Sequence, residues 1–383
     1  MAVQTEVDRV HLARAIELAE QGRGQVSPNP LVGAVIVGAD GEVAGEGWHA
    51  RFGGPHAERE AIAAAGGAGL EGATLYVSLE PCCHHGKTPP CTEAIVEAGI
   101  VRVVVGSDDP SEKASGRGLG ILRDEGVEVE VADGELATRA RLLNQPFRKH
   151  ARTGRPWVLF KSAMTLDGKV ATMSGDSKWI SGEPSRERAH WWRTECDAVA
   201  VGIGTALHDD PRLTARPGDF AAGMAGAAAP GQPRRIVFDS DARLPQDSQL
   251  LREAQDVPLT VVVSRAARRT ATQALETAGA EVIVAAGENE PARVRHALDQ
   301  LGVREVTSIL LEGGPHLAGA FLDAGEIDEI RLFLAPLVLG GRSSRATLEG
   351  EGAEAISDAV RALTLDCETV GEDLLVSARL REW

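Results

Sequence analysis

The sequence predicts an α/β protein built from two domains, and three observations support this prediction. The chain has 383 residues, more than one hydrophobic core usually organises. Short apolar runs alternate with segments of helical periodicity in both halves, which is typical of helices packed around a sheet. Between the halves, Gly154 and Pro156 interrupt a polar helical stretch. We therefore expect one domain at 1–152 and a second at 153–383.

The first domain is expected to begin with a helix over residues 8–21, followed by the turn SPNP. Two apolar runs, LVGAVIVG and EVAGEGW, flank the pair Asp40-Gly41, which is a hairpin signal. HAEREAIAAAG is typical of a helix, ATLYVSLE of a buried strand, and CTEAIVEAG of a helix that begins at Cys91. A strand at IVRVVVGSD, the pair GILRDEG and VEVEVA, and a polar helical stretch from 134 to about 152 complete the domain.

The second domain starts with WVLFKSAMTLDGKVA and again alternates strands with helices. The expected strands are DAVAVGIG, RRIVFDS, LTVVVS, AEVIVA, VTSILLEGG and EIRLFLAPLVLG. PARVRHALDQLG is typical of the helices between them. The stretch AAGMAGAAAPGQP is low in complexity and is expected to be a surface loop.

Composition argues against two kinds of partner. The net charge of −16, from 56 acidic and 40 basic side chains, is unfavourable for a protein that neutralises nucleic-acid phosphates. No apolar run reaches the length of a membrane span, and the N-terminus has no apolar signal core, so we expect no membrane association and a cytoplasmic location. Three of the five cysteines lie in one loop, which favours metal binding over a disulfide framework.

Two stretches of the first domain have the residue types of a catalytic zinc site. PHAERE contains His56 and Glu58, and EPCCHHGKTPPC contains Cys82 and Cys91. Zinc sites that keep one position open for water use three protein ligands, commonly His and Cys. Zinc-dependent base deaminases combine H-x-E with a later P-C and a second Cys, and their Glu moves protons between water and departing ammonia. The pattern therefore predicts hydrolytic deamination, with Glu58 as general acid and base.

The spacing of the cysteines leaves alternatives open. Eight residues separate Cys82 from Cys91, where most such signatures have two, and Cys83 is adjacent to Cys82, so that pair cannot easily bind one metal. A purely structural zinc is the competing interpretation, although the neighbouring glutamate and only three well-spaced ligands favour an open site. His84 and His85 are interpreted as loop or pocket residues, because the ligand set is complete without them.

The second domain offers less specific signals. It lacks the G-x-G-x-x-G fingerprint after its first strand, which weakens a Rossmann interpretation. The candidate loops at strand ends are TLDGKVA, GDSKWISG, GIGTALHDDPRLTAR and LEGGPHLAGAF. The last places a Gly-Gly turn between a strand and a helix, so helix amides could face a phosphate. Such turns are also common where nothing binds, and surface ion pairs are the competing interpretation of each arginine.

Residues 26–91, with SPNPLVGAVIV, HAERE and EPCCHHGKTPPC, resemble the deaminase half of the bifunctional riboflavin-biosynthesis deaminase/reductase family, and the resemblance covers nearly the whole chain. It implies a cytidine-deaminase-like α/β/α domain followed by a dihydrofolate-reductase-like α/β domain. In that family the long loop separates two zinc ligands. Position by position, the resemblance implies zinc ligands at His56, Cys82 and Cys91, a proton shuttle at Glu58, and substrate contacts at Asn29, His49 and Lys87.

The same resemblance implies that the second domain is a reductase that uses NADPH. The dinucleotide contacts that it implies are Ala163, Trp179, Thr205, Asp209, Ser240, Gly314, Pro315, His316, Leu317, Ala318, Gly319 and Ala320. The contacts to a ribose phosphate substrate are Ser177, Arg193, Leu213, Arg216 and Glu312. Two arginines suit a phosphate, because each offers a planar bidentate fork. Lys161 and Asp167 lie close in sequence to this site, and neither is assigned as a proton donor.

These assignments imply two consecutive steps of riboflavin synthesis. The first is deamination of 2,5-diamino-6-(5-phosphoribosylamino)pyrimidin-4(3H)-one, and the second is reduction of its ribosyl side chain to ribityl. The expected partner is a small phosphorylated pyrimidine, and family members are usually homo-oligomers. Two rival hypotheses remain: a nucleic-acid or nucleoside deaminase with an unrelated appendage, and a second domain that binds a nucleotide without catalysis.

Overall fold

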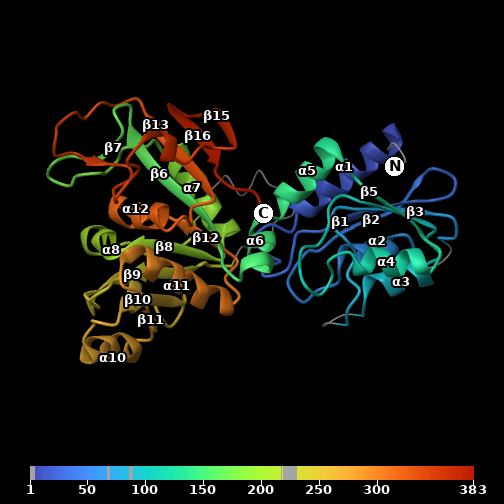
Figure 1. Ribbon diagram of the computed structural model, residues 1–383, viewed down its shortest axis with the longest axis horizontal. Helices are drawn as coiled ribbons and strands as arrows, with labels where there is room; N and C mark the ends of the chain where they lie inside the picture. The colour runs from blue at the N-terminus through green and yellow to red at the C-terminus, as the bar shows by residue number, and fades with distance from the viewer. Residues whose placement is uncertain (1–4, 67–69, 86–88, 217, 219–230) are drawn as a thin grey trace. The chain divides into compact units, whose positions relative to one another are not determined.

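The computed structural model describes residues 5–66, 70–85, 89–216, 218 and 231–383. The chain forms two compact units, one of Met1–Thr153 together with Trp383 and the other of Gly154–Glu382. Each unit is organised around its own central sheet (Figure 1). The expected α/β class is therefore confirmed in both halves. Within the described ranges, no helix combines the length and the apolar character that crossing a membrane requires.

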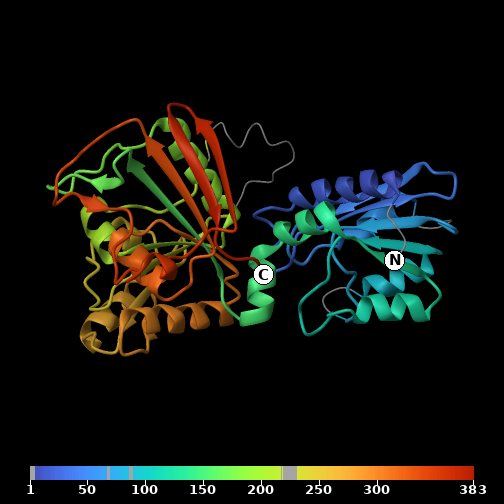
Figure 2. The same cartoon turned by 45° about the horizontal axis from the view of Figure 1, so that its top comes forward.

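The first unit is a three-layer α/β/α sandwich. Its elements are α1 (Glu6–Glu20), β1 (Gly33–Val37), β2 (Val43–Trp48), α2 (Ala57–Ala64), β3 (Thr74–Val77), α3 (Cys91–Glu97), β4 (Arg102–Val105), α4 (Arg117–Asp124), β5 (Glu128–Val131), α5 (Gly134–Leu143) and α6 (Gln145–Thr153). The strand order is β2-β1-β3-β4-β5, with β1 antiparallel to its neighbours and the last three strands parallel. Helices α1 and α5 cover one face, and α2, α3 and α4 cover the other (Figures 1 and 2).

Alternation along the strands explains how one sheet supports both helical layers. On β1, Ala34 and Ile36 face the core beneath α2, α3 and α4, while Val35 and Val37 face the core beneath α1 and α5. Successive strand side chains point to opposite faces, so a strand buried on both sides is apolar at every position. The run GAVIV is buried throughout, as this requires.

Most elements expected in the first domain are present. The predicted hairpin is confirmed, because β1 and β2 pair antiparallel across the Asp40-Gly41 turn. The helix predicted to begin at Cys91 does begin there. The first helix starts earlier than the expected residue 8, because Thr5 and Asp8 form a capping box that satisfies amides of the first turn.

Close packing of β2 against α2 fixes the start of that helix. A Cβ atom on Gly45 would lie 2.3 Å from the Ala61 main-chain oxygen, and one on Gly47 would lie 2.5 Å from the Ala61 nitrogen. Neither approach leaves space for a larger residue. The two glycines of EVAGEGW therefore hold α2 directly on the sheet, and its first residues face the site described below.

The second unit contains a nine-stranded sheet. Its elements are β6 (Trp157–Thr165), β7 (Lys169–Ala171), α7 (Glu183–Glu195), β8 (Ala198–Gly202), α8 (Ile203–Asp209), β9 (Arg234–Phe238), α9 (Gln249–Arg252), β10 (Leu259–Ser264), α10 (Arg269–Thr277), β11 (Glu281–Ala285), α11 (Glu290–Val303), β12 (Ser308–Leu311), α12 (Pro315–Asp323), β13 (Glu329–Ala335), β14 (Arg345–Ala346), a 3-10 turn (Ile356–Asp358), β15 (Thr364–Val370) and β16 (Asp373–Arg379). The order is β11-β10-β9-β8-β12-β6-β13-β16-β15, parallel from β11 to β13 and antiparallel beyond.

The strand order creates a switch point between β8 and β12. The chain leaving β8 continues through α8 to β9 on one side, and the chain leaving β12 continues through α12 to β13 on the other. In open α/β sheets, the carboxyl ends of strands at such a point enclose a crevice that binds ligands. A Cβ on Gly314 would lie 3.4 Å from the Thr205 hydroxyl, so the start of α8 and the loop after β12 meet there.

Two features of the second half go beyond the sequence expectations. The antiparallel hairpin of β15 and β16 was not expected, although Gly371 between the strands has the positive φ of 62° that favours glycine. The expected strand EIRLFLAPLVLG ends at Ala335, before Pro336. The predicted loop AAGMAGAAAPGQP, residues 221–233, lies largely outside the described residues.

Candidate active sites

The three predicted zinc ligands converge in the first unit. His56 is the residue before the first turn of α2, Cys82 follows β3, and Cys91 is the first residue of α3. Their ligand atoms lie within 4.8 Å of one another. The His56 Nδ1 atom is 3.5 Å from the Cys82 sulfur and 3.3 Å from the Cys91 sulfur. One imidazole and two thiol groups suit zinc, and three ligands leave a tetrahedral position open.

Hydrogen bonds of the neighbouring main chain hold the two cysteine segments together. The Cys91 amide donates to the Cys82 sulfur over 3.3 Å, and the Thr92 amide donates to the Cys82 carbonyl over 3.2 Å. From α2, the Arg59 guanidinium donates to the carbonyls of Pro89 and Pro90, at 3.2 and 3.1 Å. Arg59 thus ties the His56 helix to the segment that delivers Cys91, a role that the sequence analysis missed.

The predicted proton shuttle lies beside this cluster. Glu58 is in the first turn of α2 and only 3% exposed. Burial, together with the nearby charge of Cys82, raises the pKa of its carboxyl group. Glu58 also shares a hydrogen bond with the Cys91 side chain. A buried carboxyl group beside a three-ligand metal site suits the role of general acid and base.

Asn29 and His49 form a pair next to His56. The His49 Nδ1 atom lies 2.8 Å from the carbonyl oxygen of Pro55, which can only accept, so this nitrogen carries the proton. The His49 Nε2 atom is then an acceptor, and the Asn29 amide donates to it over 3.1 Å. Burial lowers the pKa of His49, which keeps the ring neutral. Its ring lies edge-on to that of His56, with centroids 5.4 Å apart.

Glu80 is a further residue of this site that the sequence analysis did not assign. It is 3% exposed, and its carboxylate accepts the amides of Asp109, Gly116 and Gly118, at 3.3, 3.0 and 3.1 Å. A Cβ on Gly118 would lie 2.3 Å from the Pro81 carbonyl, so the loop sits directly on the Pro81-Cys82 segment. The available signal was an acidic residue at a strand end, immediately before Pro-Cys.

The remaining residues of the cysteine loop have other positions. Cys83 points its thiol at the Lys113 carbonyl, 3.6 Å away, and is not part of the three-residue ligand group. His84 and His85 are exposed, and His85 lies 3.9 Å from Glu93. Lys87, the expected phosphate contact, lies outside the described residues.

In the second unit, all five predicted substrate contacts line one cavity of about 650 Å³. It opens on the switch-point side of the sheet, between α7 and the segment after α8. The five residues come from four separate segments: Ser177, Arg193, Leu213, Arg216 and Glu312. Lys161 of β6 lines the same cavity. The fold therefore collects residues that are far apart in the sequence.

A buried ion pair stands at the centre of this cavity. Arg193 and Glu312 form a bidentate pair, with distances of 2.6 and 2.8 Å, and their side chains are only 13% and 12% exposed. Burial raises the pKa of the Glu312 carboxyl group, but the charges of Arg193 and Lys161 outweigh it and lower that pKa to about 2. Burial also lowers the pKa of Lys161, against the opposing effect of Glu312.

His190 lies between the two predicted phosphate-binding arginines. Its Nδ1 atom is 3.4 Å from Arg193, and its Nε2 atom is 3.4 Å from Arg216. Burial, followed by the charges of Arg193 and Arg216, lowers the pKa of His190 to about 4. A neutral imidazole therefore lies between two cations, and both arginines line the cavity. No sequence pattern pointed to His190, because its contact with Arg216 joins two separate segments.

The predicted dinucleotide contacts divide between two neighbouring cavities. Trp179, Thr205 and Asp209 line the larger one. A second cavity, of about 380 Å³, lies at the carboxyl ends of β8, β9 and β10. Thr205 lines both cavities, and the other predicted contacts that line the smaller one are Ser240, Gly314, His316, Leu317 and Ala320. The two cavities therefore share Thr205, which lies beside Gly314 at the N-terminus of α12.

Four predicted dinucleotide contacts line neither cavity: Ala163, Pro315, Ala318 and Gly319. Ala318 is fully buried in the core between α12 and the sheet. Gly319 faces the chain at Glu349, whose carbonyl oxygen would lie 1.5 Å from a Cβ. Asp167 also lines neither cavity. Its carboxylate instead accepts hydrogen bonds from the Thr165 hydroxyl and from the amides of Leu339 and Gly340.

Comparison with protein families agrees with both sites. Residues 5–107 match the cytidine and deoxycytidylate deaminase zinc-binding region, and residues 156–376 match the RibD C-terminal domain. The riboflavin biosynthesis protein RibD of Actinobacillus pleuropneumoniae is 41% identical over 97% of this chain and 95% of its own length. RibD of Escherichia coli is 38% identical over 96% of this chain and 98% of its own length.

Solved structures give the same result. RibD of Acinetobacter baumannii is 35% identical and superposes with a TM-score of 0.84, covering 98% of this chain and 99% of that one. A Thermotoga maritima protein described as a diaminohydroxyphosphoribosylaminopyrimidine deaminase/5-amino-6-(5-phosphoribosylamino)uracil reductase is also 35% identical, with a TM-score of 0.81 and the same coverage.

Fold and sites together define a bifunctional enzyme in which a zinc-dependent deaminase precedes an NADPH-dependent reductase. The chain belongs to the RibD family, whose members act in riboflavin biosynthesis. The family and the two cofactors expected from the sequence are thereby confirmed.

Proposed function

We propose that residues 1–152 deaminate 2,5-diamino-6-(5-phosphoribosylamino)pyrimidin-4(3H)-one and that residues 153–383 then reduce the ribosyl chain of the product. The observation that supports the first step best is the buried Glu58 beside the His56, Cys82 and Cys91 cluster. The observation that supports the second is the cavity that collects Lys161, Arg193 and Glu312.

In the deamination, the carbon that carries the 2-amino group gains a bond to oxygen from water and loses its bond to nitrogen, which leaves as ammonia. Zinc, held by His56, Cys82 and Cys91, supplies Lewis-acid activation of water near neutral pH. Glu58 accepts a proton from this water and returns one to the departing amine. The raised pKa of its carboxyl group suits a group that must carry the proton between the two events.

Asn29 and His49 orient the pyrimidine in this scheme. Because the Asn29 amide donates to His49, its carboxamide oxygen is available to accept from a ring N–H or amino group. Glu80 holds the loop from Asp109 to Gly118 against the cysteine segment, so it acts through that loop rather than on the substrate. Lys87 is proposed as a substrate contact on the family resemblance alone.

In the reduction, the C1′–O4′ bond of the ribosyl group opens, C1′ gains a hydride and O4′ gains a proton. NADPH supplies the hydride. We place the cofactor from Trp179 and Asp209 past Thr205 and Gly314 to Ser240, because these residues line two neighbouring cavities that share Thr205. Ala163, Pro315, Ala318 and Gly319 line neither cavity and are proposed as cofactor contacts on the family resemblance alone.

Lys161 is the proposed source of the proton. It lines the substrate cavity together with Glu312, whose charge opposes the lowering of the Lys161 pKa by burial. Arg193 and Arg216 are proposed to bind the phosphate, since both line the cavity and neutral His190 lies between them. Ser177 and Leu213 complete the wall of the cavity.

Three wider expectations belong to the same proposal. The acidic chain acts on a small molecule rather than on nucleic acid. It works in the cytoplasm. It forms a homo-oligomer, which the exposed apolar side chains around the edge strand β15 support: Leu363 is 59% exposed and Leu365 is 67% exposed.

The test is a coupled assay on the purified full chain with the diaminopyrimidine ribosyl phosphate. Ammonia release and NADPH absorbance are followed separately, and zinc is measured on the same sample. We expect ammonia first, NADPH loss afterwards, and about one zinc per chain. Ammonia release without NADPH oxidation would contradict the reductase assignment. NADPH oxidation that precedes ammonia release would contradict the proposed order.

A further inference from the structure

Helix α6 of the first unit buries a polar face. Its buried residues are Gln145, Arg148 and Lys149, which are 4%, 1% and 1% exposed. Residues at i, i+3 and i+4 are neighbours on a helix surface, so these three side chains form one continuous face. Charged side chains are rarely buried unless they have partners. Neither proposed reaction step uses this face, and its partners indicate a different role.

All three side chains contact Trp383, which belongs to the first unit. The Arg148 Nε atom donates to the main-chain oxygen of Trp383 over 2.6 Å. The Gln145 carboxamide accepts the Trp383 amide over 2.8 Å and donates to the same main-chain oxygen over 3.3 Å. The Lys149 ammonium lies over the indole ring, 5.4 Å from its centroid. Trp383 is therefore held through its main chain by hydrogen bonds and through its ring by a cation–π contact.

Arg148 extends this contact toward the metal site. Its Nη1 atom donates to the Asp108 carbonyl over 2.8 Å, and its Nη2 atom lies 3.1 Å from an Asp108 carboxylate oxygen. The residues on either side of Asp108 are both bound to Glu80. The Glu80 amide donates to the Ser107 carbonyl over 2.9 Å, and the Asp109 amide donates to the Glu80 carboxylate over 3.3 Å. One buried guanidinium therefore supports the start of the loop that Glu80 holds against the cysteine segment.

The residue before α6 holds a second loop of the site. Asn144 is 2% exposed, and its carboxamide accepts the Leu31 amide over 2.8 Å and donates to the Leu31 carbonyl over 2.9 Å. Leu31 directly follows the SPNP turn, which contains Asn29, the partner of His49. The Arg148 amide donates to the Asn144 carbonyl over 2.9 Å, so Asn144 is joined to the first turn of α6. The start of α6 therefore supports both the SPNP turn and the loop after β4.

We propose that Trp383 is a positioning residue for deamination, because it satisfies the buried polar face of α6 and so fixes the two loops that this helix supports. The inference rests on the first unit being the deaminase, and not on the exact substrate. Without Trp383, the Arg148 guanidinium and the Gln145 carboxamide lose partners at a buried place, which is costly unless the helix start rearranges. Either response loosens the contacts of Arg148 with Asp108 and of Asn144 with the SPNP turn.

The elements that carry the chemistry differ from those that α6 supports. His56 and Glu58 belong to the start of α2, and Cys91 begins α3. The supported loops instead follow α1 and β4, and the first of them carries Asn29, which is proposed to orient the pyrimidine. Loosening these loops therefore weakens substrate binding while proton transfer and metal binding continue. The expected effect of losing Trp383 is a higher KM for deamination with a nearly unchanged kcat and zinc content.

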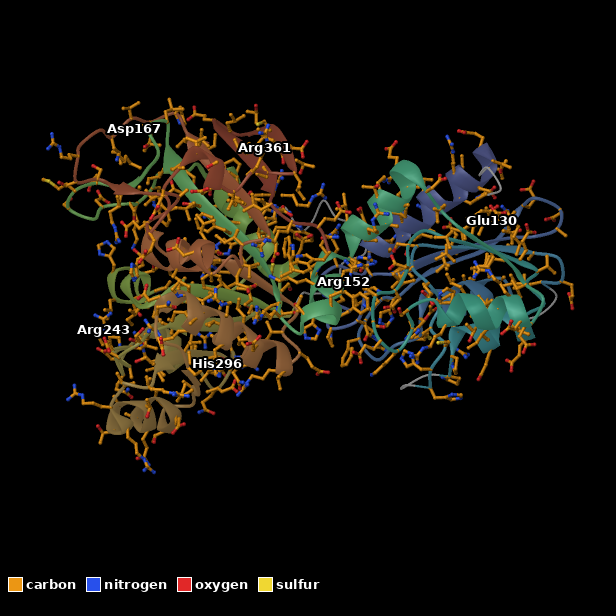
Figure 3. All side chains as sticks on the ribbon, viewed as in Figure 1. Glu130, Arg152, Asp167, Arg243, His296 and Arg361 are labelled. Atoms are coloured by element: carbon orange, nitrogen blue, oxygen red, sulfur yellow. The ribbon has the colours of Figure 1, made fainter. Side chains whose placement is uncertain are left out.

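The experiment compares the wild-type full chain with Trp383→Ala, Trp383→Phe, Arg148→Lys and the control Arg152→Lys. Phenylalanine keeps an aromatic ring over Lys149, so Trp383→Phe is the rescue variant. Lysine at position 148 keeps the charge but lacks the planar fork that reaches both Trp383 and Asp108. Arg152 is exposed on the same helix (Figure 3), so Arg152→Lys makes the same exchange away from the buried face.

Four properties are measured on each protein. They are KM and kcat for ammonia release, zinc content, NADPH oxidation with the deaminated intermediate, and hydrogen–deuterium exchange of the main-chain amides. The exchange of residues 29–32 and 107–118 is compared with that of β3, Thr74–Val77, which lies inside the sheet and reports general unfolding of the first unit.

For Trp383→Ala we expect KM for deamination to rise about tenfold, with kcat within about threefold and zinc content unchanged. The amides of both loops should exchange about tenfold faster, while those of β3 and the rate of NADPH oxidation stay the same. Arg148→Lys should resemble Trp383→Ala, and Trp383→Phe and Arg152→Lys should resemble wild type. In the double variant with Glu80→Gln, KM should rise by less than the product of the single effects, because both residues act through one loop.

An unchanged KM for Trp383→Ala would overturn the inference, and so would a higher KM without faster exchange in either loop. Equally faster exchange of β3 would also overturn it, because Trp383 would then stabilise the first unit as a whole. If the wild type released no ammonia from the diaminopyrimidine ribosyl phosphate, the proposed substrate would be wrong. The exchange pattern would in that case still decide whether Trp383 positions the loops, so the two failures are distinguishable.

Discussion

The two active sites of this chain differ in how far apart their residues lie in the sequence. In the first unit, the metal ligands and the proton shuttle come from residues 56–58 and 82–91. In the second, the cavity wall runs from Lys161 to Glu312. Metal chemistry restricts both the residue types and their spacing, so a short motif carries the information. A crevice at strand ends has no such restriction, because the sheet brings its residues together.

The sites also differ in how they handle buried charge. The first contains the thiols of Cys82 and Cys91, the buried carboxyl group of Glu58 and the neutral ring of His49. When the thiols bind a metal as thiolates, the metal cation balances their negative charge. The second balances its own charges through Arg193 and Glu312. A buried ion pair costs desolvation energy, and removing one partner leaves the other uncompensated. We therefore expect single substitutions to affect chemistry in the first unit and both binding and stability in the second.

The largest effect is expected from Glu58→Gln. The amide cannot carry a proton between water and ammonia, so deamination should fall by about 10²–10⁴-fold. The ligand atoms are untouched, so zinc content should equal that of wild type. NADPH oxidation with the deaminated intermediate should be unchanged. Loss of zinc from this variant would show that Glu58 supports the metal rather than the chemistry.

Glu312→Gln tests the buried pair of the second unit. Arg193 would remain buried without a counter-charge, which costs about 3–5 kcal/mol when one partner of such a pair is removed. We expect kcat/KM for reduction to fall about a hundredfold or more and the second unit to melt earlier, with deamination unchanged. The matched control is Glu368→Gln, whose 3.1 Å pair with Arg188 has one mostly exposed partner and should cost less than about 1 kcal/mol.

Glu80→Gln tests whether the hydrogen bonds between Glu80 and the loop amides support deamination in the first unit. An amide nitrogen in place of one carboxylate oxygen cannot accept the loop amides, and a lost bond to a buried group costs about 1–3 kcal/mol. We expect KM for deamination to rise about tenfold with zinc content unchanged. Glu46→Gln, in an exposed pair with Arg14, is the control. Equal effects of the two variants would exclude a specific role for the loop.

Acid should weaken the second unit through His190. Its pKa is lowered from 6.5 to about 4 in the folded protein. Between these pH values, His190 is therefore protonated in the unfolded chain and neutral in the folded chain. The stability contributed by the neutral ring is present above pH 6.5 and is lost as the pH falls toward 4. Urea unfolding across this window should show a shallower pH dependence for His190→Gln, by about 1 kcal/mol. Identical slopes would contradict this account.

The smallest effect is expected from Cys83→Ser. The thiol faces the Lys113 carbonyl and stands outside the ligand group, so stability should change by no more than about 0.5 kcal/mol and zinc content should stay the same. Cys82→Ser, its neighbour, should lose the metal. Release of zinc by Cys83→Ser would make the ligand assignment wrong.

The sequence alone supported a large part of the first site. His56, Glu58, Cys82 and Cys91 were assigned from their types and spacing, and the structure brings the three ligands together. Arg59 and Glu80 escaped notice, because their roles are hydrogen bonds to main-chain atoms of distant segments. Main-chain partners leave no pattern of residue types in a sequence.

In the second unit, sequence reasoning without the family resemblance did not go beyond strand-end loops. From the sequence alone, Arg193 was best interpreted as one half of a surface ion pair. The structure instead shows it largely buried and paired with Glu312. His190 was not noticed, since its significance depends on the two arginines beside it. The β15 and β16 hairpin was also missed, and it supplies the outer edge of the sheet.

The sequence by itself determined the α/β class, the chemistry of the metal site and the family, because residue type, periodicity and short spacing are local properties of a chain. Tertiary structure decided which charges are buried, which arginines are already paired, and which loops meet at the switch point between β8 and β12. Those properties depend on desolvation and on contacts between distant segments, and neither exists until the sheet has assembled.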